Sequence, residues 1–156
     1  ESKTRPMGRG ASGVRGIRLK NEMDEVVGMI SVNDMDTSVL VVSENGYGKR
    51  SSLDDYRITN RGGKGVKTIS ITEKTGDLVS IKDVTDSDDL MIINKSGIAI
   101  RMEVLNLRVM GRATQGVKLI NLKGRDQIAA VAKVMKDDDA IEDLDNIDIS
   151  EGPIIE

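Results

Sequence analysis

Arginine and glycine recur together three times along the chain, in the pattern R-x-x-x-R-x-x-x-G-V-[KR]-x-I. The pattern starts at Arg5, Arg57 and Arg108, so successive copies are 52 and 51 residues apart. Guanidinium groups bind phosphate oxygens through paired hydrogen bonds, and backbone N–H groups left accessible by glycine can bind them as well. A single arginine usually only faces solvent, but an arginine pair kept in three repeats favours contact with phosphate groups.

The candidate phosphate-binding residues are the basic side chains that recur in or beside these motifs. Equivalent positions of a repeated fold lie on the same rim of successive units, so we expect these side chains to form one curved basic stripe. Such a stripe binds the backbone of a nucleic acid and does not read its bases. The set is Arg5, Arg9, Arg15, Arg18, Lys49, Arg50, Arg57, Arg61, Lys64, Lys67, Arg101, Arg108, Arg112 and Lys118.

The composition argues against most other chemistry. The 156 residues include no Cys, His, Trp or Phe, and Tyr47 and Tyr56 are the two aromatic residues. We therefore expect no disulfide, thiol nucleophile, imidazole base, metal site or cofactor in this chain, and neither tyrosine lies beside a base. Binding of single strands by stacking on aromatic rings is also disfavoured. Because no apolar run approaches the ~20 residues of a membrane span and no signal peptide opens the chain, we expect no membrane partner.

The net charge of -3 conceals two oppositely charged parts. Residues 137–156 contain nine Asp or Glu and no Lys or Arg, whereas residues 1–136 have 23 basic and 17 acidic side chains, a formal charge of +6. The acidic segment is expected to be a disordered tail, which either aids solubility or competes with nucleic acid for the basic body.

The positioning elements are predicted to be short β-strands. Runs rich in Val and Ile, with near period-2 alternation, occupy residues 65–71, 78–84, 90–96 and 97–105. A weaker alternation at residues 26–32 matches 78–84 and 128–134 in the repeat.

Two short turns support the same interpretation. Asn45-Gly46 and Ser96-Gly97 separate paired runs and predict tight hairpins with a positive φ. Four strands per ~50 residues is typical of a propeller blade. We therefore predict an all-β, propeller-like partial ring over residues 1–136, of about two and a half four-stranded blades.

Other motifs carry less weight. Residues 8–13 match G-x-G-x-x-G, but the motif is lost in the other repeats and no strand-then-helix context surrounds it. The acidic clusters Asp54-Asp55 and 86–89 have no companions at ligand spacing, so we predict solvated loops.

Residues 7–19, 44–69 and 96–120 resemble the C-terminal domain of the A subunit of bacterial DNA gyrase. The paralogous subunit of topoisomerase IV has a more degenerate repeat of the same type and is the close second. The family's hallmark heptapeptide is Q-R-R-G-G-K-G. Residues 59–65 share its last five letters but lack the leading Gln-Arg, which is typical of a later blade.

The resemblance implies a six-bladed β-pinwheel of which this chain carries about the last half. It implies a cytoplasmic protein whose basic rim binds and bends duplex DNA, supporting ATP-dependent negative supercoiling by the whole enzyme. It places the catalytic residues, ATP and Mg²⁺ in other parts of that enzyme, and it implies two partners, the catalytic core and the B subunit. The residues themselves leave open a propeller-type scaffold that binds an acidic protein, and unpaired strand edges would allow self-association.

Overall fold

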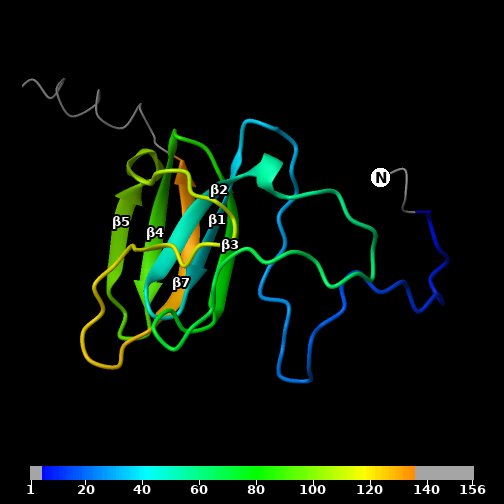
Figure 1. Cartoon of the computed structure of the whole chain (residues 1–156), viewed down its shortest axis with the longest axis horizontal. Helices are drawn as coiled ribbons and strands as arrows, with labels where there is room; N and C mark the ends of the chain where they lie inside the picture. Colours follow the sequence, from blue (N-terminus) through cyan, green and yellow to red (C-terminus); the bar gives the residue numbers. More distant parts are fainter. Residues whose placement is uncertain (1–4, 136–156) are drawn as a thin grey trace, which may run out of the picture.

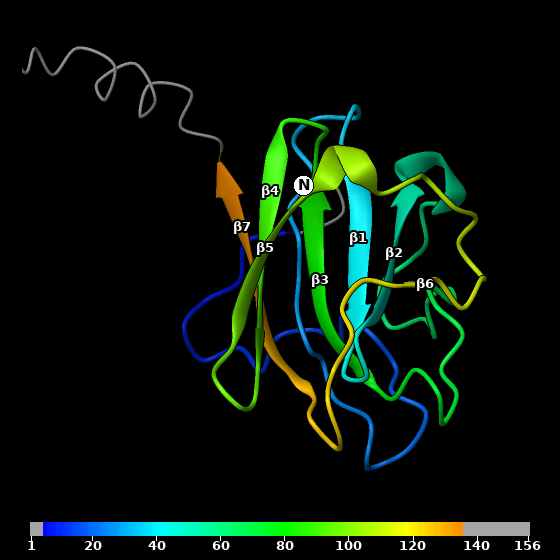
Figure 2. The same ribbon diagram turned by 90° about the vertical axis from the view of Figure 1, so that its left-hand side faces the viewer.

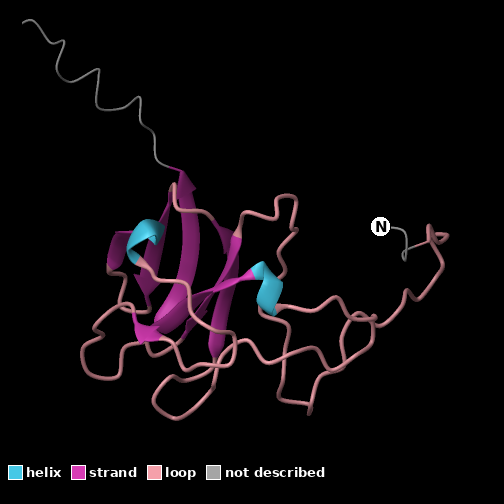
Figure 3. Ribbon diagram, turned by 45° about the horizontal axis from the view of Figure 1, so that its top comes forward, coloured by secondary structure: helices cyan, strands magenta, loops and turns pink. Residues whose placement is uncertain are grey.

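A computed structural model describes residues 5–135, and its regular structure there is antiparallel β-sheet with two short 3-10 turns (Figures 1 and 3). One sheet has the strand order β3-β1-β2-β6 and the other β5-β4-β7 (Figure 2). The strands are β1 (Ser38–Ser43), β2 (Tyr47–Ser52), β3 (Leu78–Val84), β4 (Asp88–Asn94), β5 (Ala99–Glu103), β6 (Val117–Lys118) and β7 (Ile128–Met135), and the 3-10 turns are η1 (Leu53–Asp55) and η2 (Val104–Asn106).

Both predicted hairpins are confirmed. β1 pairs with β2 and β4 pairs with β5, and each connection is a four-residue turn closed by a glycine amide. Gly46 N donates to Ser43 O at 3.1 Å, and Gly97 N donates to Asn94 O at the same distance. Both glycines have a positive φ, +80° at Gly46 and +86° at Gly97. Because the two turns are 51 residues apart, they also align the two sheets as copies of one repeat.

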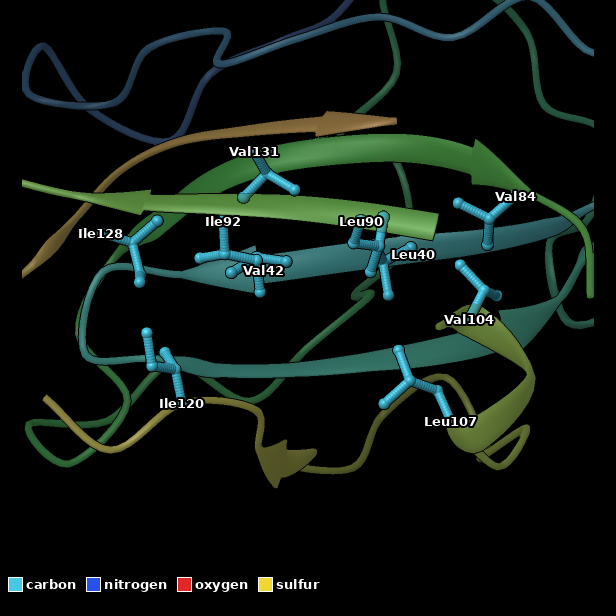
Figure 4. Packing of buried hydrophobic residues seen from close by; sticks show 10 residues of the cluster. All are labelled: Leu40, Val42, Val84, Leu90, Ile92, Val104, Leu107, Ile120, Ile128 and Val131. Carbon is cyan, nitrogen blue, oxygen red and sulfur yellow. The ribbon is translucent and has the colours of Figure 1, made fainter. Parts of the chain in front are cut away.

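The main hydrophobic core lies between the two sheets (Figure 4). Leu40 and Val42 of β1 face Leu90 and Ile92 of β4, and all four side chains are fully buried. The 3-10 turn η2 contributes Val104, which packs into the same cluster. Burial of such apolar surface, at about 25 cal/mol per Å², is what holds the two sheets together.

A second cluster covers the opposite face of β1. Val39 and Val41 pack there against Ile69, with Tyr56 and Ile81 at the margin. Every residue of β1 is therefore buried, which explains why its sequence SVLVVS is almost continuously apolar instead of alternating.

Two predicted strands are absent, and the same cause explains both. Residues 65–71 and 26–32 are not strands. β6 pairs with β2 about 70 residues upstream, and β3 pairs with β1 about 40 residues upstream. Among residues 5–135 no strand lies at these spacings upstream of 65–71 or 26–32, so neither segment has a described strand to pair with. Residues 5–36 accordingly lie to one side of the sheets without regular structure (Figure 1).

The expectation of four strands per blade needs a refinement. The first sheet has four strands, but its fourth, β6, comes from the next repeat, and the second sheet has three strands within the described residues. The predicted strand at 97–105 is shorter, because η2 takes over after Glu103. The predicted acidic tail, 137–156, lies outside the described residues. Within residues 5–135 no helix is long and apolar enough to cross a membrane.

Candidate nucleic-acid interface

The third arginine motif crosses the edge of the preceding sheet. Its chain first meets β2 where Met110 N donates to Arg50 O at 2.8 Å. It then leaves as a loop and returns as β6, which pairs with Tyr47 and Gly48 of β2. At the return point Gly116 has a φ of +83°, and a Cβ there would lie 2.5 Å from Gly48 O. The glycine of the motif is thus required for the crossing itself.

The first and second motifs lie side by side. Gly62 N donates to Gly16 O, and Arg18 N donates to Gly63 O, both at 2.8 Å, around a parallel bridge between Ile17 and Gly63. This pairing brings Arg15 and Arg61 to one surface hollow of about 380 Å³. In the described residues, the hydrogen bonds of 5–12 are local, so the pairing with the second motif involves the end of the first motif and not Arg5 or Arg9.

The second and third motifs are joined as well. Arg112 Nη1 donates to Lys67 O at 2.7 Å, and Ser70 N donates to Thr114 O at 3.1 Å. Gln115 Nε2 adds a hydrogen bond to Thr72 Oγ1 at 2.9 Å. The three motifs therefore form a connected series along the molecule, in the order of the repeats.

Most of the candidate side chains in this series are available to a ligand. Ten of them are exposed and have no ion pair to a described carboxylate: Arg5, Arg9, Arg15, Arg18, Arg57, Arg61, Lys64, Lys67, Arg108 and Lys118. Arg112 is half-buried and uses one guanidinium nitrogen on Lys67 O, which leaves its other donors unassigned. Unpaired guanidinium and ammonium groups in series are suited to a row of phosphates.

Two of the predicted residues, Lys49 and Arg50, are buried in the fold, and for them the expectation of an accessible phosphate-binding side chain is corrected; a third, Arg101, is exposed but makes an ion pair. Lys49 is 1% exposed and donates to backbone carbonyls of the third motif. Arg50 is 7% exposed and pairs with Asp86, Nη1 to Oδ1 at 2.5 Å. Arg101 is more exposed, but its Nε pairs with Asp89 Oδ2 at 2.6 Å.

The misassignment of Lys49 and Arg50 has a physical cause. Both lie in β2, where alternation should place one of two consecutive side chains in solvent. The loop 111–114 of the third motif accepts hydrogen bonds from Lys49 on one face of the strand, whereas Arg50, on the opposite face, is held in an ion pair by Asp86. The burial also lowers the pKa of Lys49, and the positive charge of Arg112 lowers it further, against an opposing effect of Asp55. The sequence did contain one sign that these two residues differ from the others. They lie inside a strand of a predicted hairpin and not in the arginine motif.

Two further residues lie beside the series of arginine motifs and were not predicted from the sequence. Lys74 Nζ lies 5.3 Å from the centre of the Tyr47 ring, a cation–π contact, and Tyr47 is opposite Lys118 in the β2–β6 ladder. Neither residue recurs in the repeats. Tyr47 follows the turn glycine Gly46, for example, whereas Ile98 follows the equivalent Gly97. The repeat pattern therefore gave no signal for them.

The acidic clusters are partly structural. Asp54 and Asp55 are exposed, as predicted for solvated turns, but Asp88 and Asp89 are buried at the start of β4. Asp88 Oδ2 accepts hydrogen bonds from the backbone N and Oγ1 of Thr85. Elsewhere, donation from the Ser96 hydroxyl is the main reason that the pKa of Asp126 is lowered. No group of acidic side chains within residues 5–135 is arranged to hold a metal ion.

Comparison with known proteins agrees with this architecture. The family model described as "DNA gyrase C-terminal domain, beta-propeller" matches residues 5–33, 37–85 and 88–135. The DNA gyrase A subunit of Staphylococcus aureus strain MRSA252 is 49% identical over 153 residues, which are 97% of this chain and 17% of that protein. Its counterpart from strain NCTC 8325 / PS 47 is 52% identical over 139 residues, 88% of this chain and 15% of that protein. The chain thus spans about a sixth of the length of these relatives.

Two solved structures share the fold. The structure of a DNA gyrase A C-terminal domain superposes with a TM-score of 0.74 at 30% identity, over 84% of this chain and 44% of that one. The C-terminal domain of a DNA topoisomerase IV superposes with a TM-score of 0.72 at 21% identity, over 79% and 38%. The second likeness shows the fold alone. With the family model and the identity to the two gyrase proteins, the repeated strands and arginine motifs have one explanation: the chain belongs to the family of beta-propeller C-terminal domains of the DNA gyrase A subunit.

Proposed function

We propose that this chain binds duplex DNA without sequence preference and bends it along the series of arginine motifs. The observation that carries the proposal is the set of exposed, unpaired basic side chains in three motifs that are hydrogen-bonded to one another in repeat order. Contacts of this kind neutralise phosphates and release counterions, so they need no particular base sequence.

The free energy gained from the phosphate contacts must exceed the free energy that bending the duplex costs. Turning a 20–30 bp stretch by 40–90° costs on the order of 1–6 kcal/mol. Neutralising about six phosphates changes DNA affinity by about 10³-fold between 50 and 200 mM salt, or about 4 kcal/mol, so the salt-dependent term is of the same size as the cost of bending.

In the longer relatives we infer a supporting role for this segment. It would hold DNA in a bent path while the rest of the enzyme, with its B subunit, uses ATP and Mg²⁺ to introduce negative supercoils. In this proposal the chain contributes DNA binding and no chemical step, and the cytoplasm is where it meets chromosomal DNA.

The test is a titration of the chain with mixed-sequence linear duplexes of increasing length, from about 20 bp upward, at about 50 and 200 mM salt. We expect affinity to rise with duplex length, to be insensitive to sequence and to fall steeply with salt. Duplexes labelled at both ends should show their ends approaching on binding. A chain that bound an acidic polypeptide tightly and duplex DNA weakly, with no dependence on length, would be a protein-interaction scaffold and would refute the proposal.

A further inference from the structure

Lys49 is the largest side chain that is fully buried in the described part of the chain. Its Nζ donates to Gly111 O at 2.5 Å, to Arg112 O, and to Thr114 Oγ1 at 3.4 Å. All three acceptors belong to the loop of the third arginine motif, and no described carboxylate forms an ion pair with Lys49. Asp55 acts on this ammonium only through space, and a buried charge without a direct ion pair is favourable only if its donors are satisfied by such dipoles.

The position of Lys49 allows this one side chain to hold the loop to β2, beside the bonds that tie the loop to the second motif. The chain attaches to β2 at Arg50, through Met110 N, and again at Gly48, through Val117. Residues 111–116 leave the strand between these two points, and Lys49 lies between them on β2. The carbonyl oxygens of Gly111 and Arg112 bond to the ammonium, while the guanidinium of Arg112 bonds to the second motif at Lys67 O.

The other repeat offers an internal comparison. The turn glycines, Gly46 and Gly97, align Lys49 with Ile100 of β5. No described segment crosses β5 as 109–118 crosses β2, and Ile100 is 40% exposed. The strand position that the motif loop covers, in β2, is therefore a lysine, and the equivalent position in β5, which no described loop covers, is apolar.

We propose that Lys49 is a positioning residue of the DNA interface: it holds the loop 111–114 against β2, so that Arg108, Arg112 and Lys118 present their side chains together. The DNA part of this inference rests on the proposed function. Lys49 itself does not reach DNA. Its removal takes the ammonium donor away from both loop carbonyls, of which Gly111 O still accepts from Thr114, and the loop loses its side-chain hydrogen bonds to β2 between the two attachment points.

The first test concerns the loop and needs no DNA. In the 156-residue wild-type chain, the Lys49 ammonium protons should give an NMR signal protected from exchange with water, unlike those of the exposed Lys64. In Lys49→Met, the amides of Met110 and Leu119 should exchange about 10- to 100-fold faster, while amides of β1 and β4 keep their protection. A Lys49 ammonium in fast exchange in the wild type, or unchanged loop amides in a folded Lys49→Met, would overturn the proposal.

The second test measures the dependence of DNA affinity on salt. Each phosphate contact contributes about 0.9 to the slope of log K against log salt. If Lys49 positions the loop, Lys49→Met should lower the slope by about 2 to 3, because three basic side chains lose their common placement. A decrease of about 0.9, which is expected of the control Lys64→Met, would make Lys49 an ordinary contact, and no decrease would make it irrelevant to binding. Either result refutes positioning.

The two tests separate the two proposals. If the wild-type chain shows no salt-dependent affinity for duplex DNA, the proposed function fails, while amide exchange still decides whether Lys49 holds the loop. Lys49→Arg keeps the charge and the donors, so it should restore both the slope and the protection of Met110 and Leu119. A folded Lys49→Arg with the Lys49→Met phenotype would contradict a role for the cation.

Discussion

Replacing Arg57 and Arg61 by alanine is the most direct test of the arginine series. Both side chains are exposed and neither makes an ion pair with a described residue, so the double variant should fold as the wild type does. Exposed substitutions of this kind usually change the free energy of unfolding by less than about 0.5 kcal/mol. An effect on DNA affinity would therefore report on the contacts themselves.

The magnitude follows from counterion release. Two lost phosphate contacts lower the salt slope by about 1.8, which corresponds to about 60-fold weaker binding at 0.1 M salt and almost no difference near 1 M. The loss should be the same for duplexes of different sequence, because no base contact is removed. Fluorescence anisotropy with a labelled duplex of about 30 bp at four salt concentrations measures both the affinity and the slope.

The matched control removes the same charge from outside the motifs. Lys123 and Arg125 are exposed and lie in a turn before β7, so Lys123→Ala with Arg125→Ala lowers the net charge equally. We expect this control to change the slope less than the Arg57 and Arg61 pair. Equal changes would mean that DNA senses only the net charge, and an unchanged slope in the motif variant would refute the basic series as a DNA site.

Four other outcomes follow from the structure. Leu90→Ala should destabilise the fold by about 2–5 kcal/mol in urea unfolding, because Leu90 is fully buried between the sheets; a loss below about 0.5 kcal/mol, as at an exposed site, would contradict this core. Gly116→Ala should cost more than Gly97→Ala, since both have a positive φ but only a Cβ at Gly116 meets backbone; equal losses would mean that the close crossing does not matter. Deleting residues 137–156 should tighten DNA binding at low salt by removing nine acidic charges, and unchanged affinity would leave the tail without a role in binding. Burial lowers the pKa of Lys49 below 10.5 in the folded chain, so at pH values between the lowered pKa and 10.5 the unfolded chain binds more protons than the folded one. The free energy of unfolding of the wild type should therefore rise with pH in this range, and the rise should disappear in Lys49→Met.

Local features of the fold were predictable from the sequence because they depend on residues that are close along the chain. The turns at Gly46 and Gly97 need a positive φ, which glycine adopts readily, and the apolar runs on either side of each turn pair with each other. The pairing of β6 with β2 joins residues about 70 positions apart, and no local pattern specifies it. For the same reason residues 26–32, which match the strand 78–84 in the repeat, are not a strand themselves.

The candidate site shows the same division. Arg57, Arg61 and Arg108 were identified by their recurrence, and they are exposed as expected of binding residues. Lys49 and Arg50 have the same charge and lie near the motif, but both are buried, Lys49 against the loop of the next repeat and Arg50 in an ion pair with Asp86. Residue type and spacing therefore predicted which side chains are candidates for binding phosphate. Which of these side chains are exposed depends on contacts between residues far apart in the sequence.

The motif combines two functions in one segment, and this has a consequence for bending. Its Val-Lys part forms β6 on the preceding sheet, while its arginines lie just before that crossing. In the third repeat the arginines are therefore located at the junction between two sheets and not in the middle of either. In the proposed complex, the force that bends the duplex would act on that junction. The hydrogen bonds of Lys49 to the loop and of Arg112 to Lys67 O are the contacts that resist it there. The angle between neighbouring sheets, which the core around Leu40 and Leu90 determines, would then set the angle by which the DNA turns from one arginine pair to the next.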